Sequence, residues 1–355
     1  MTSDGPCLKQ RPGDFLVREN LLVPLIDPGE ATHHHLLMRK CGFTTFEAMR
    51  LLANQLGCDS EDITYAGLKD EDGVTEQLVA VPMRAANGVL GAGTVDIVPM
   101  SGTDCLSVQH YGYSNGPLRV GRLEGNTFRI VVRNLDVELA CQLEARRRIS
   151  FCALNYYDTQ RFGVPCGPKL THVLGRHLLK REWQEAFDVL LRLGAPETCI
   201  AQQWQGSPEE FFTKALERRV ANFYLSAWAS HEWNRTLSDL VREVADDEVY
   251  AMTVNGITYD YLRTSQAAAQ VLARTSELDY RRLTFGSEAP ETSSPRATVV
   301  QVALQVDAAQ PDDAHPGRAA VTLCFALPSG CYATGVIRQL LTPFIESVER
   351  QESAC

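Results

Sequence analysis

Hydrophobic and polar residues recur with two different periods along this chain, so both helices and strands are expected. In TTFEAMRLLANQLG (44–57) apolar residues lie three or four positions apart, and Thr44 and Glu47 have the spacing of a helix capping box. FRIVVR (128–133) begins by alternating apolar and basic residues, which predicts a strand with Phe128 on its protected face and the arginines opposite. The two patterns together indicate mixed α and β structure.

Helical spacing dominates the middle of the chain. It predicts helices over residues 137–150, 170–193 and 211–241. The sequence GSEAPETSSPRA (286–297) is rich in Gly, Pro and Ser and is expected to be a linker or a return connection. Strands are expected at 298–306 and 319–327, and a further helix at 334–348. Strands near both ends, with helices between them, indicate one sheet domain interrupted by an inserted domain.

The composition is that of an ordinary globular protein. Of 355 residues, 45% are hydrophobic and 22% are charged, which favours neither disorder nor a fibrous repeat. We find no long apolar run and no signal peptide at the N-terminus, so we expect a cytoplasmic protein without a membrane segment. Eleven cysteines without a CxxC pair predict reduced, mostly buried thiols, and no metal site.

The net charge of −10 bears on the choice of partner. Proteins that bind nucleic-acid backbones usually do so with clustered Lys and Arg, which displace counterions from the phosphates. An acidic chain is therefore a poor general binder of polyanions, although a local basic groove remains compatible with this charge.

Two conspicuous patterns carry no chemistry in our interpretation. The HHH run at 33–35 lacks neighbouring ligands at metal spacing, and we expect it to be solvated or at a sheet edge. GVLGAGTVD (88–96) has Asp96 where a dinucleotide loop needs its third glycine, so it is expected to be a turn. Phosphate-loop, hydrolase-elbow and zinc-protease motifs are absent from the sequence.

Four regions, taken together, point to a chemistry. They are PGDFLVREN (12–20), YAGLKDEDGVTEQ (65–77), LEGNTFRI (123–130) with NYYDTQRFG (155–163), and LPSGCYATGVIRQL (327–340). On these motifs, which span nearly the whole chain, the sequence resembles the TruD-type pseudouridine synthases. The resemblance implies an α+β fold, in which a catalytic domain with a mixed, mainly antiparallel sheet (1–150 and 298–355) is interrupted by a helix-rich TruD-type insertion domain (151–297).

The resemblance also implies a reaction. The N1–C1′ bond of a uridine is broken, the uracil turns over, and C5 is joined to C1′. By motif, Asp70 is the catalytic aspartate, although taken alone it would be interpreted as a solvated loop carboxylate. A carboxylate with a pKa near 4 is ionised at neutral pH, so it can attack C1′ or remove the 2′ proton, and the sequence leaves both routes open.

The resemblance adds two further catalytic residues and two lysines. Asn126 and Phe128 match the family's active-site pair, Phe128 stacking on the uracil and Asn126 donating a hydrogen bond to the Asp70 carboxylate. Stacking of this kind contributes roughly 1–3 kcal/mol per base. Lys40 is a candidate ion-pair partner of Asp70, whereas Lys69 is expected to face the other way; both are tentative substrate-binding residues.

Four more candidates for substrate binding come from the later motifs: Asn155, Gln160, Arg161 and Tyr332. The planar guanidinium group of Arg161 could bind a phosphate of the substrate or a carboxylate within the protein, and both roles are left open. Tyr332 is expected either to line the uracil site or to pack in the hydrophobic core. We expect no cofactor, because the isomerisation needs none and no nucleotide or metal motif is present.

The chain departs from the family pattern where RNA contacts are expected. Glu71 and Asp72 follow Asp70 where the family has a basic residue, and NYFG and REL have become NYYD and RQL. Acidic residues there would repel phosphates. The sequence-based hypothesis is therefore a free uridine nucleotide such as UMP as the substrate, for C-nucleoside synthesis, with its phosphate bound by Arg161, Arg119 or Arg129. The alternatives are a uridine in tRNA or, in another class, a non-catalytic RNA-binding chaperone.

Overall fold

The computed structural model describes residues 5–85, 93–101, 103–163, 167–286 and 291–352. Contacts divide the chain into two compact units, one formed by Met1–Ser150 with Val302–Gly330 and the other by Phe151–Gln301 with Cys331–Cys355. The predicted boundary near 150 coincides with this division, but the segment 331–355 groups with the second unit. The assignment of catalytic and insertion roles to the two parts stays a prediction.

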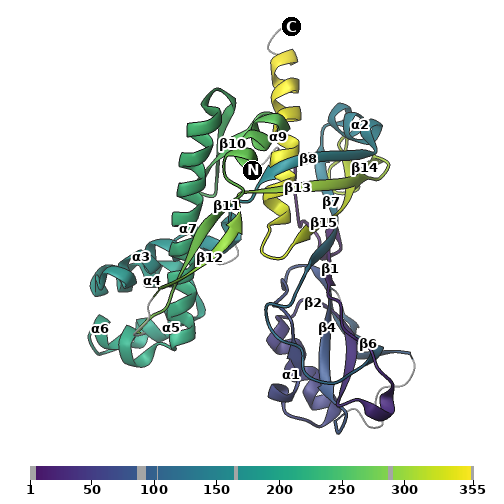
Figure 1. Ribbon diagram of the computed structural model, residues 1–355, viewed down its shortest axis with the longest axis vertical. Coiled ribbons are helices and arrows are strands. Elements are labelled where there is room, and N and C mark those ends of the chain that lie inside the picture. The colour runs from purple at the N-terminus through teal and green to yellow at the C-terminus, as the bar shows by residue number, and fades with distance from the viewer. Residues whose placement is uncertain (1–4, 86–92, 102, 164–166, 287–290, 353–355) are drawn as a thin grey trace. The chain divides into compact units, whose positions relative to one another are not determined.

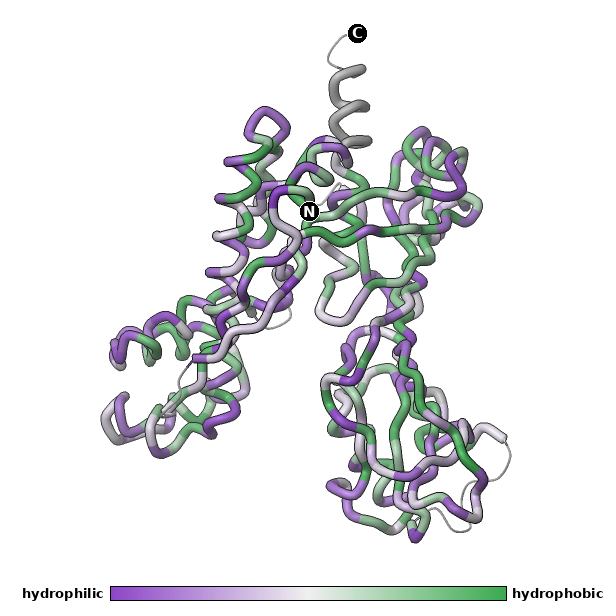
Figure 2. The backbone as a smooth tube through the Cα atoms, in the orientation of Figure 1, coloured by the Kyte–Doolittle hydropathy of each residue, from purple (hydrophilic) through white to green (hydrophobic). Residues whose placement is uncertain are grey.

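The first unit is built on a mixed sheet (Figure 1). Its strands and helices, in chain order, are β1 (Phe15–Asn20), β2 (His33–Cys41), α1 (Thr45–Leu56), β3 (Thr64–Tyr65), β4 (Val74–Pro82), β5 (Thr94–Ser101), β6 (Asp104–Ser114), β7 (Gly125–Leu135), α2 (Val137–Arg146), β14 (Gln310–Pro311) and β15 (Ala319–Pro328). The strands β8 (Arg148–Leu154) and β13 (Val299–Val306) each run on into the second unit. In the first unit, hydrophobic residues follow the strands and hydrophilic residues gather in the loops (Figure 2).

The strand order is β5-β6-β2-β4-β1-β7-β15-β13-β8. Within the first unit, the described pairings are antiparallel, with the exception of β1 and β4, which run parallel. The α+β class with a mixed, mainly antiparallel sheet is confirmed. The predicted strands at 298–306 and 319–327 are confirmed as β13 and β15.

Helix α1 begins as its sequence predicts. The Thr44 side chain accepts a hydrogen bond from Glu47 N, Glu47 reciprocates, and Gly57 ends the helix in the left-handed region with φ 68°. Its buried face packs Met49 and Leu52 against strands β2, β4 and β6. Phe46, in contrast, is 46% exposed, so it does not belong to this face.

Strand register places one row of residues side by side across five strands. Lys40 pairs with Thr75, Thr75 with Val17, Val17 with Phe128, and Phe128 with Phe325. Paired residues in neighbouring strands point to the same face of a sheet. Lys40 and Phe128, which are 88 positions apart, therefore lie on one face.

The second unit is mainly helical, with two hairpins. Its elements are α3 (Thr171–Lys180), α4 (Trp183–Leu193), α5 (Pro196–Gln203), α6 (Pro208–Glu210), a π-helical turn (Phe211–Ala215), α7 (Arg218–Ala245), β9 (Val249–Val254), β10 (Ile257–Leu262), α8 (Ser265–Arg274), β11 (Glu277–Leu283), β12 (Glu291–Ala297) and α9 (Ala333–Glu352). Helices α3, α4, α5 and α7 share one apolar core, which includes Leu174, Leu190, Phe211 and Tyr224.

Several sequence predictions for these helices and their connections need correction. The segment 170–193 forms two helices, because Arg181 adopts φ 58° and ends α3. The segment predicted at 211–241 is broken at Leu216 and Glu217, before α7 begins. The expected linker at 286–297 contains strand β12, which pairs with β11 from Leu283↔Glu291 to Glu277↔Ala297.

The HHH run is also corrected. It begins β2, which lies between β4 and β6 and not at the sheet edge, and His34 and His35 are buried. Burial lowers the pKa of each imidazole to about 4. The described cysteines are free, as predicted, but among them Cys41 alone is fully buried. The expected turn at 88–96 lies partly outside the described residues, and β5 begins at Thr94. Searched over the same residues, the helices include none that could cross a membrane.

Candidate active site

Asp70 lies in the loop that connects β3 to β4. This loop closes tightly against β1, because a Cβ atom on Gly73 would lie 2.7 Å from the Phe15 carbonyl oxygen. The Asp70 side chain is 40% exposed. It is therefore a surface carboxylate on a loop whose main chain the sheet holds closely.

The Asp70 carboxylate pairs with Lys9, with Nζ 2.7 Å from Oδ2. The same ammonium group lies 4.2 Å from the centroid of the Phe15 ring. Lys9 was missed in the sequence analysis, although it lies only three residues before Pro12 and the first quoted motif. Lys40, the partner we expected, does not take this place.

Lys40 instead binds the main chain of the loop. Its side chain is fully buried, and Nζ donates to the carbonyl oxygens of Phe43 at 2.9 Å and Asp70 at 2.6 Å. Burial lowers the pKa of Lys40 from 10.5 to about 8, and nearby carboxylates, Asp70 first, oppose this shift. Lys40 thus positions the main chain at Asp70, while the Asp70 carboxylate pairs with Lys9.

Lys69 is also engaged by a buried partner. Its Nζ lies 2.9 Å from Glu19 Oε1, and both side chains are almost wholly buried. The prediction that Lys69 does not pair with Asp70 is confirmed. Glu19 Oε2 in turn accepts a hydrogen bond from Leu78 N at 3.0 Å, so this pair joins the loop to both β1 and β4.

Two more side chains of the sheet and helix hold the loop ahead of Asp70. Gln77 Nε2 donates to the Gly67 carbonyl at 3.0 Å, and Lys69 N donates to Thr45 Oγ1 at 3.1 Å. The main chain of the loop is therefore bound to neighbouring elements at Gly67, at Lys69 and at Asp70. This arrangement preorganises the Asp70 carboxylate.

Phe128 belongs to an aromatic cluster on the same sheet face. Its ring is stacked on Phe325 at a centroid distance of 5.4 Å and contacts the edge of Phe15 at 6.2 Å. Phe128 is 6% exposed, so the predicted protected face is confirmed. Stacking on a uracil stays a prediction.

Asn126 does not make the hydrogen bond that we expected. It lies between Glu19 and Leu327 in the strand register, on the same face as Phe128. Its Oδ1 atom is buried and has no hydrogen-bond partner among the described residues. The contact with the Asp70 carboxylate is absent from this structure, and Lys9 occupies that role.

The four remaining candidates lie in the second unit. Asn155 is buried and binds the Ala297 carbonyl and Arg296, while Gln160 is exposed. Arg161 donates from Nε to Ser230 Oγ at 3.1 Å, and its guanidinium lies 5.6 Å from the ring centroid of Phe223. Tyr332 contacts the edge of Tyr157 at 5.9 Å.

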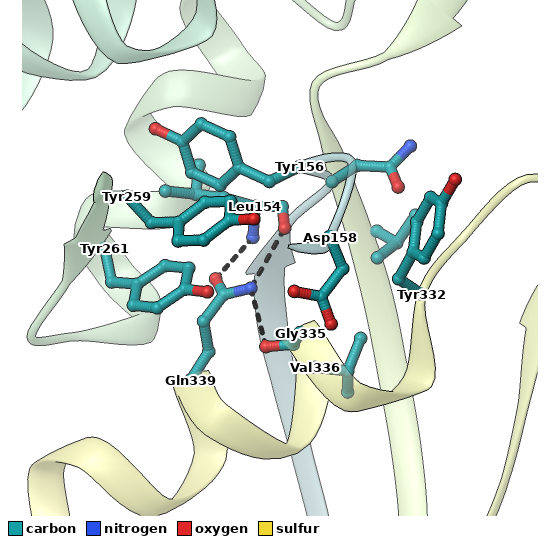
Figure 3. Close-up of a pocket in the computed structure, with 11 residues that line it drawn as sticks. Leu154, Tyr156, Asp158, Tyr259, Tyr261, Tyr332, Gly335, Val336 and Gln339 are labelled. Atoms are coloured by element: carbon teal, nitrogen blue, oxygen red, sulfur yellow. Dashed lines mark hydrogen bonds between the residues drawn. The ribbon is translucent and has the colours of Figure 1, made fainter. Parts of the chain in front are cut away.

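A small cavity beside Tyr332 belongs to the core of the second unit (Figure 3). Its volume of about 10 Å³ leaves room for at most a single water molecule. Asp158, the acid of NYYD, binds Arg338 with contacts of 2.5 and 3.0 Å and also binds Thr334. Gln339 binds the main chain of Leu154 through both of its amide atoms. Asp158 and Gln339, the two residues that depart from the family motifs, thus make contacts within the second unit.

Comparison with known proteins identifies the class. The family model described as tRNA pseudouridine synthase D (TruD) matches residues 3–205. A tRNA pseudouridine synthase D from Geotalea daltonii is 26% identical over 95% of this chain and 96% of its own length. Another, from Geobacter sp. (strain M21), is 33% identical over 62% of this chain and 52% of its own length.

A solved structure supports the fold. The crystal structure of a protein described as a putative tRNA pseudouridine synthase D from Methanosarcina mazei superimposes with a TM-score of 0.56 at 18% identity, covering 95% of this chain and 94% of that one. The protein is thus an isomerase of the pseudouridine synthase class. The chain belongs to the TruD family.

Proposed function

We propose that this enzyme converts a uridine within a tRNA to pseudouridine, with Asp70 as its catalytic carboxylate. The observation that carries the proposal is the Asp70 loop, where the carboxylate is held by Lys9 and its main chain by Lys40. The choice of tRNA is supported by the relatives, which are named as tRNA pseudouridine synthases.

The Asp70 geometry suits either chemical route. Lys9 binds Oδ2, which leaves Oδ1 without a protein partner among the described residues. Oδ1 is then available to attack C1′ or to remove the 2′ proton. In either route the C1′–N1 bond breaks, the uracil turns over, C5 bonds to C1′, and the proton on C5 is lost as N1 gains one. The reaction is therefore a balanced isomerisation.

Asn126 and Phe128 supply the neighbouring surface in this proposal. The unpartnered Oδ1 of Asn126 is an acceptor that an N–H group of uracil would satisfy once the base enters. The buried aromatic cluster around Phe128 provides an apolar wall, which favours an uncharged, planar base over water.

The comparisons favour tRNA over the mononucleotide that the sequence first suggested. Glu71 and Asp72 are exposed beside Asp70, which motivated the mononucleotide hypothesis. Glu71 helps to hold the loop only through its main chain, where its carbonyl oxygen accepts a hydrogen bond from Gly42 N at 3.2 Å. Both side chains can alter local contacts with an RNA backbone and leave the isomerisation intact. Arg161, Arg119 and Arg129 remain the alternatives for binding a phosphate.

The test compares substrates and one isosteric variant. Wild-type protein and Asp70→Asn are incubated separately with unmodified tRNA transcripts and with UMP, and products are digested and identified by chromatography and mass spectrometry. We expect pseudouridine in tRNA with the wild type and none with Asp70→Asn, whose fold is checked by thermal unfolding. Product from UMP alone would refute the tRNA substrate, and undiminished product with Asp70→Asn would refute the role of Asp70.

A further inference from the structure

The loop that carries Asp70 also presents a large apolar side chain to solvent. Leu68 lies two residues before Asp70 and is 60% exposed. Single exposed leucines are ordinary on protein surfaces. This one, however, lies on the loop whose carboxylate we propose as catalytic, and the steps of the isomerisation make no use of it. Leu68 is therefore a candidate for contact with the substrate outside the reacting atoms.

Exposure alternates along this part of the loop. The Lys69 side chain is 4% exposed, because it is buried against Glu19, whereas the Asp70 side chain is 40% exposed. Leu68 and Asp70 thus both face solvent, with a buried lysine between them. This is the pattern of a chain in which residues two positions apart point to one side. Two residues span at most about 7 Å, so the Leu68 side chain is presented close to the Asp70 carboxylate.

The main chain is held on both sides of Leu68. The Gly67 carbonyl oxygen accepts a hydrogen bond from Gln77 Nε2 at 3.0 Å, and Lys69 N donates to Thr45 Oγ1 at 3.1 Å. A leucine whose two neighbours are both bound in this way has little freedom to turn into the core. It is preorganised, as the carboxylate is, to meet a ligand that approaches from solvent.

Basic side chains lie in the segment that borders the loop. Gly121 N donates to the Ala66 carbonyl oxygen at 3.0 Å. Arg119 and Arg122, each within two residues of Gly121, are exposed. An exposed apolar side chain beside exposed cations suits a nucleic-acid strand, because the cations contact phosphates while the apolar group contacts bases.

We propose that Leu68 inserts into the RNA stack beside the target uridine and fills the space that this base leaves when it is extruded towards Asp70. The inference rests on the proposed tRNA function. Extrusion loses the stacking of the target on its neighbours, and leucine is one of the apolar side chains that proteins insert between bases. Consecutive nucleotides of one strand are about 3.4 Å apart along a double helix. A reach of about 7 Å from Asp70 therefore covers the step next to the target.

The experiment measures whether the contribution of Leu68 depends on stacking of the target. After the modified uridine is mapped, transcripts are made with abasic residues on both sides of it, so that the target has lost its stacking partners. With intact tRNA, Leu68→Ala should lower kcat/KM about 5- to 100-fold. With the abasic transcript, Leu68→Ala and wild type should differ by less than about 2-fold. Leu68→Met, which keeps a long apolar side chain, should retain most of the activity on intact tRNA.

The matched control is Val137→Ala, which truncates a 53% exposed apolar side chain at the start of α2 in the same unit. It should equal the wild type on both transcripts. Thermal unfolding of Leu68→Ala should also equal that of the wild type, because substitutions of exposed residues seldom change stability.

The inference is overturned if Leu68→Ala has wild-type kinetics on intact tRNA, or if its loss is the same on the abasic transcript. A changed oligomeric state of Leu68→Ala without dependence on stacking would indicate a protein partner and would also overturn it. Inactivity of the wild type on intact tRNA would instead show that the proposed function itself fails.

Discussion

At the residue scale, the acidic run at 70–72 divides into one held and two solvated carboxylates. Asp70 has Lys9 as its partner, and its main chain is bound by Lys40, whereas Glu71 and Asp72 are exposed. The motif singles out Asp70, but the sequence does not show which of the three acids has a partner, because the lysine that pairs with Asp70 is 61 positions away. The role of Lys9 can therefore be tested directly by substitution.

We expect Lys9→Met to lower kcat/KM about 10- to 100-fold. Hydrogen bonds to charged groups contribute about 1.5–3 kcal/mol, and this one is made to the carboxylate that we propose as catalytic. Steady-state kinetics on the tRNA transcript would measure the loss. Lys9→Arg keeps the positive charge and should recover part of the activity; equal activity of Lys9→Met and wild type would contradict the assignment.

At the scale of elements, the loop before β4 depends on one face of the sheet. Lys40, Gln77 and Glu19 come from three strands, and each reaches the loop or its side chains. Residues two positions apart on a strand point to the same face of the sheet. These three polar side chains therefore lie among the buried apolar side chains of that face and interrupt it. The loop is thus positioned by tertiary contacts and not by its own turn sequence.

Lys40→Met should release this loop, and it should also change the pH dependence of stability. The pKa of Lys40 is about 8 in the folded protein and 10.5 when unfolded, so between these values the unfolded state holds the extra proton. Stability from this group therefore rises as pH increases from 8 to 10.5, by at most about 3 kcal/mol.

Denaturant unfolding at pH 7.5 and pH 10 would measure this effect as the difference between wild type and Lys40→Met. The wild type should gain relative to the variant at the higher pH, and kcat of the variant should be reduced at both. Parallel pH profiles would argue against a buried lysine with a lowered pKa.

At the scale of the whole molecule, distant parts of the chain complete the first unit. Arg133 of β7 binds Asp14 near the N-terminus and Asp312 near the C-terminal strands, at 2.8 and 2.9 Å. These hydrogen bonds raise the pKa of the Arg133 guanidinium. The sequence pattern placed Arg129 and Arg133 on one polar face opposite the protected face; Arg129 is exposed as predicted, but Arg133 is buried.

Replacing Arg133 by Met should destabilise the first unit by about 3–5 kcal/mol, because Asp14 and Asp312 are left buried without a compensating charge. Arg129→Met, on the same strand, should change stability by less than about 0.5 kcal/mol. Urea unfolding of the two variants gives the comparison, and similar midpoints would show that the Arg133 network contributes little.

The sequence by itself determined the local elements and the chemical motif. Periodicity located α1, β13 and β15, and the motif around Asp70 indicated the reaction class, because both are encoded by residues close together in the chain. It did not reveal the ends of the middle helices or strand β12, since the pairing of β12 with β11 is not visible in its own polar sequence.

The tertiary structure alone decided which partners the site residues have. Lys9 pairs with the Asp70 carboxylate, and Lys40 binds the main-chain carbonyl oxygens of Phe43 and Asp70. Both outcomes depend on contacts between segments that are far apart in the chain. The burial and electrostatic environment of a side chain are properties of that packing, and a linear pattern of residue types does not contain them.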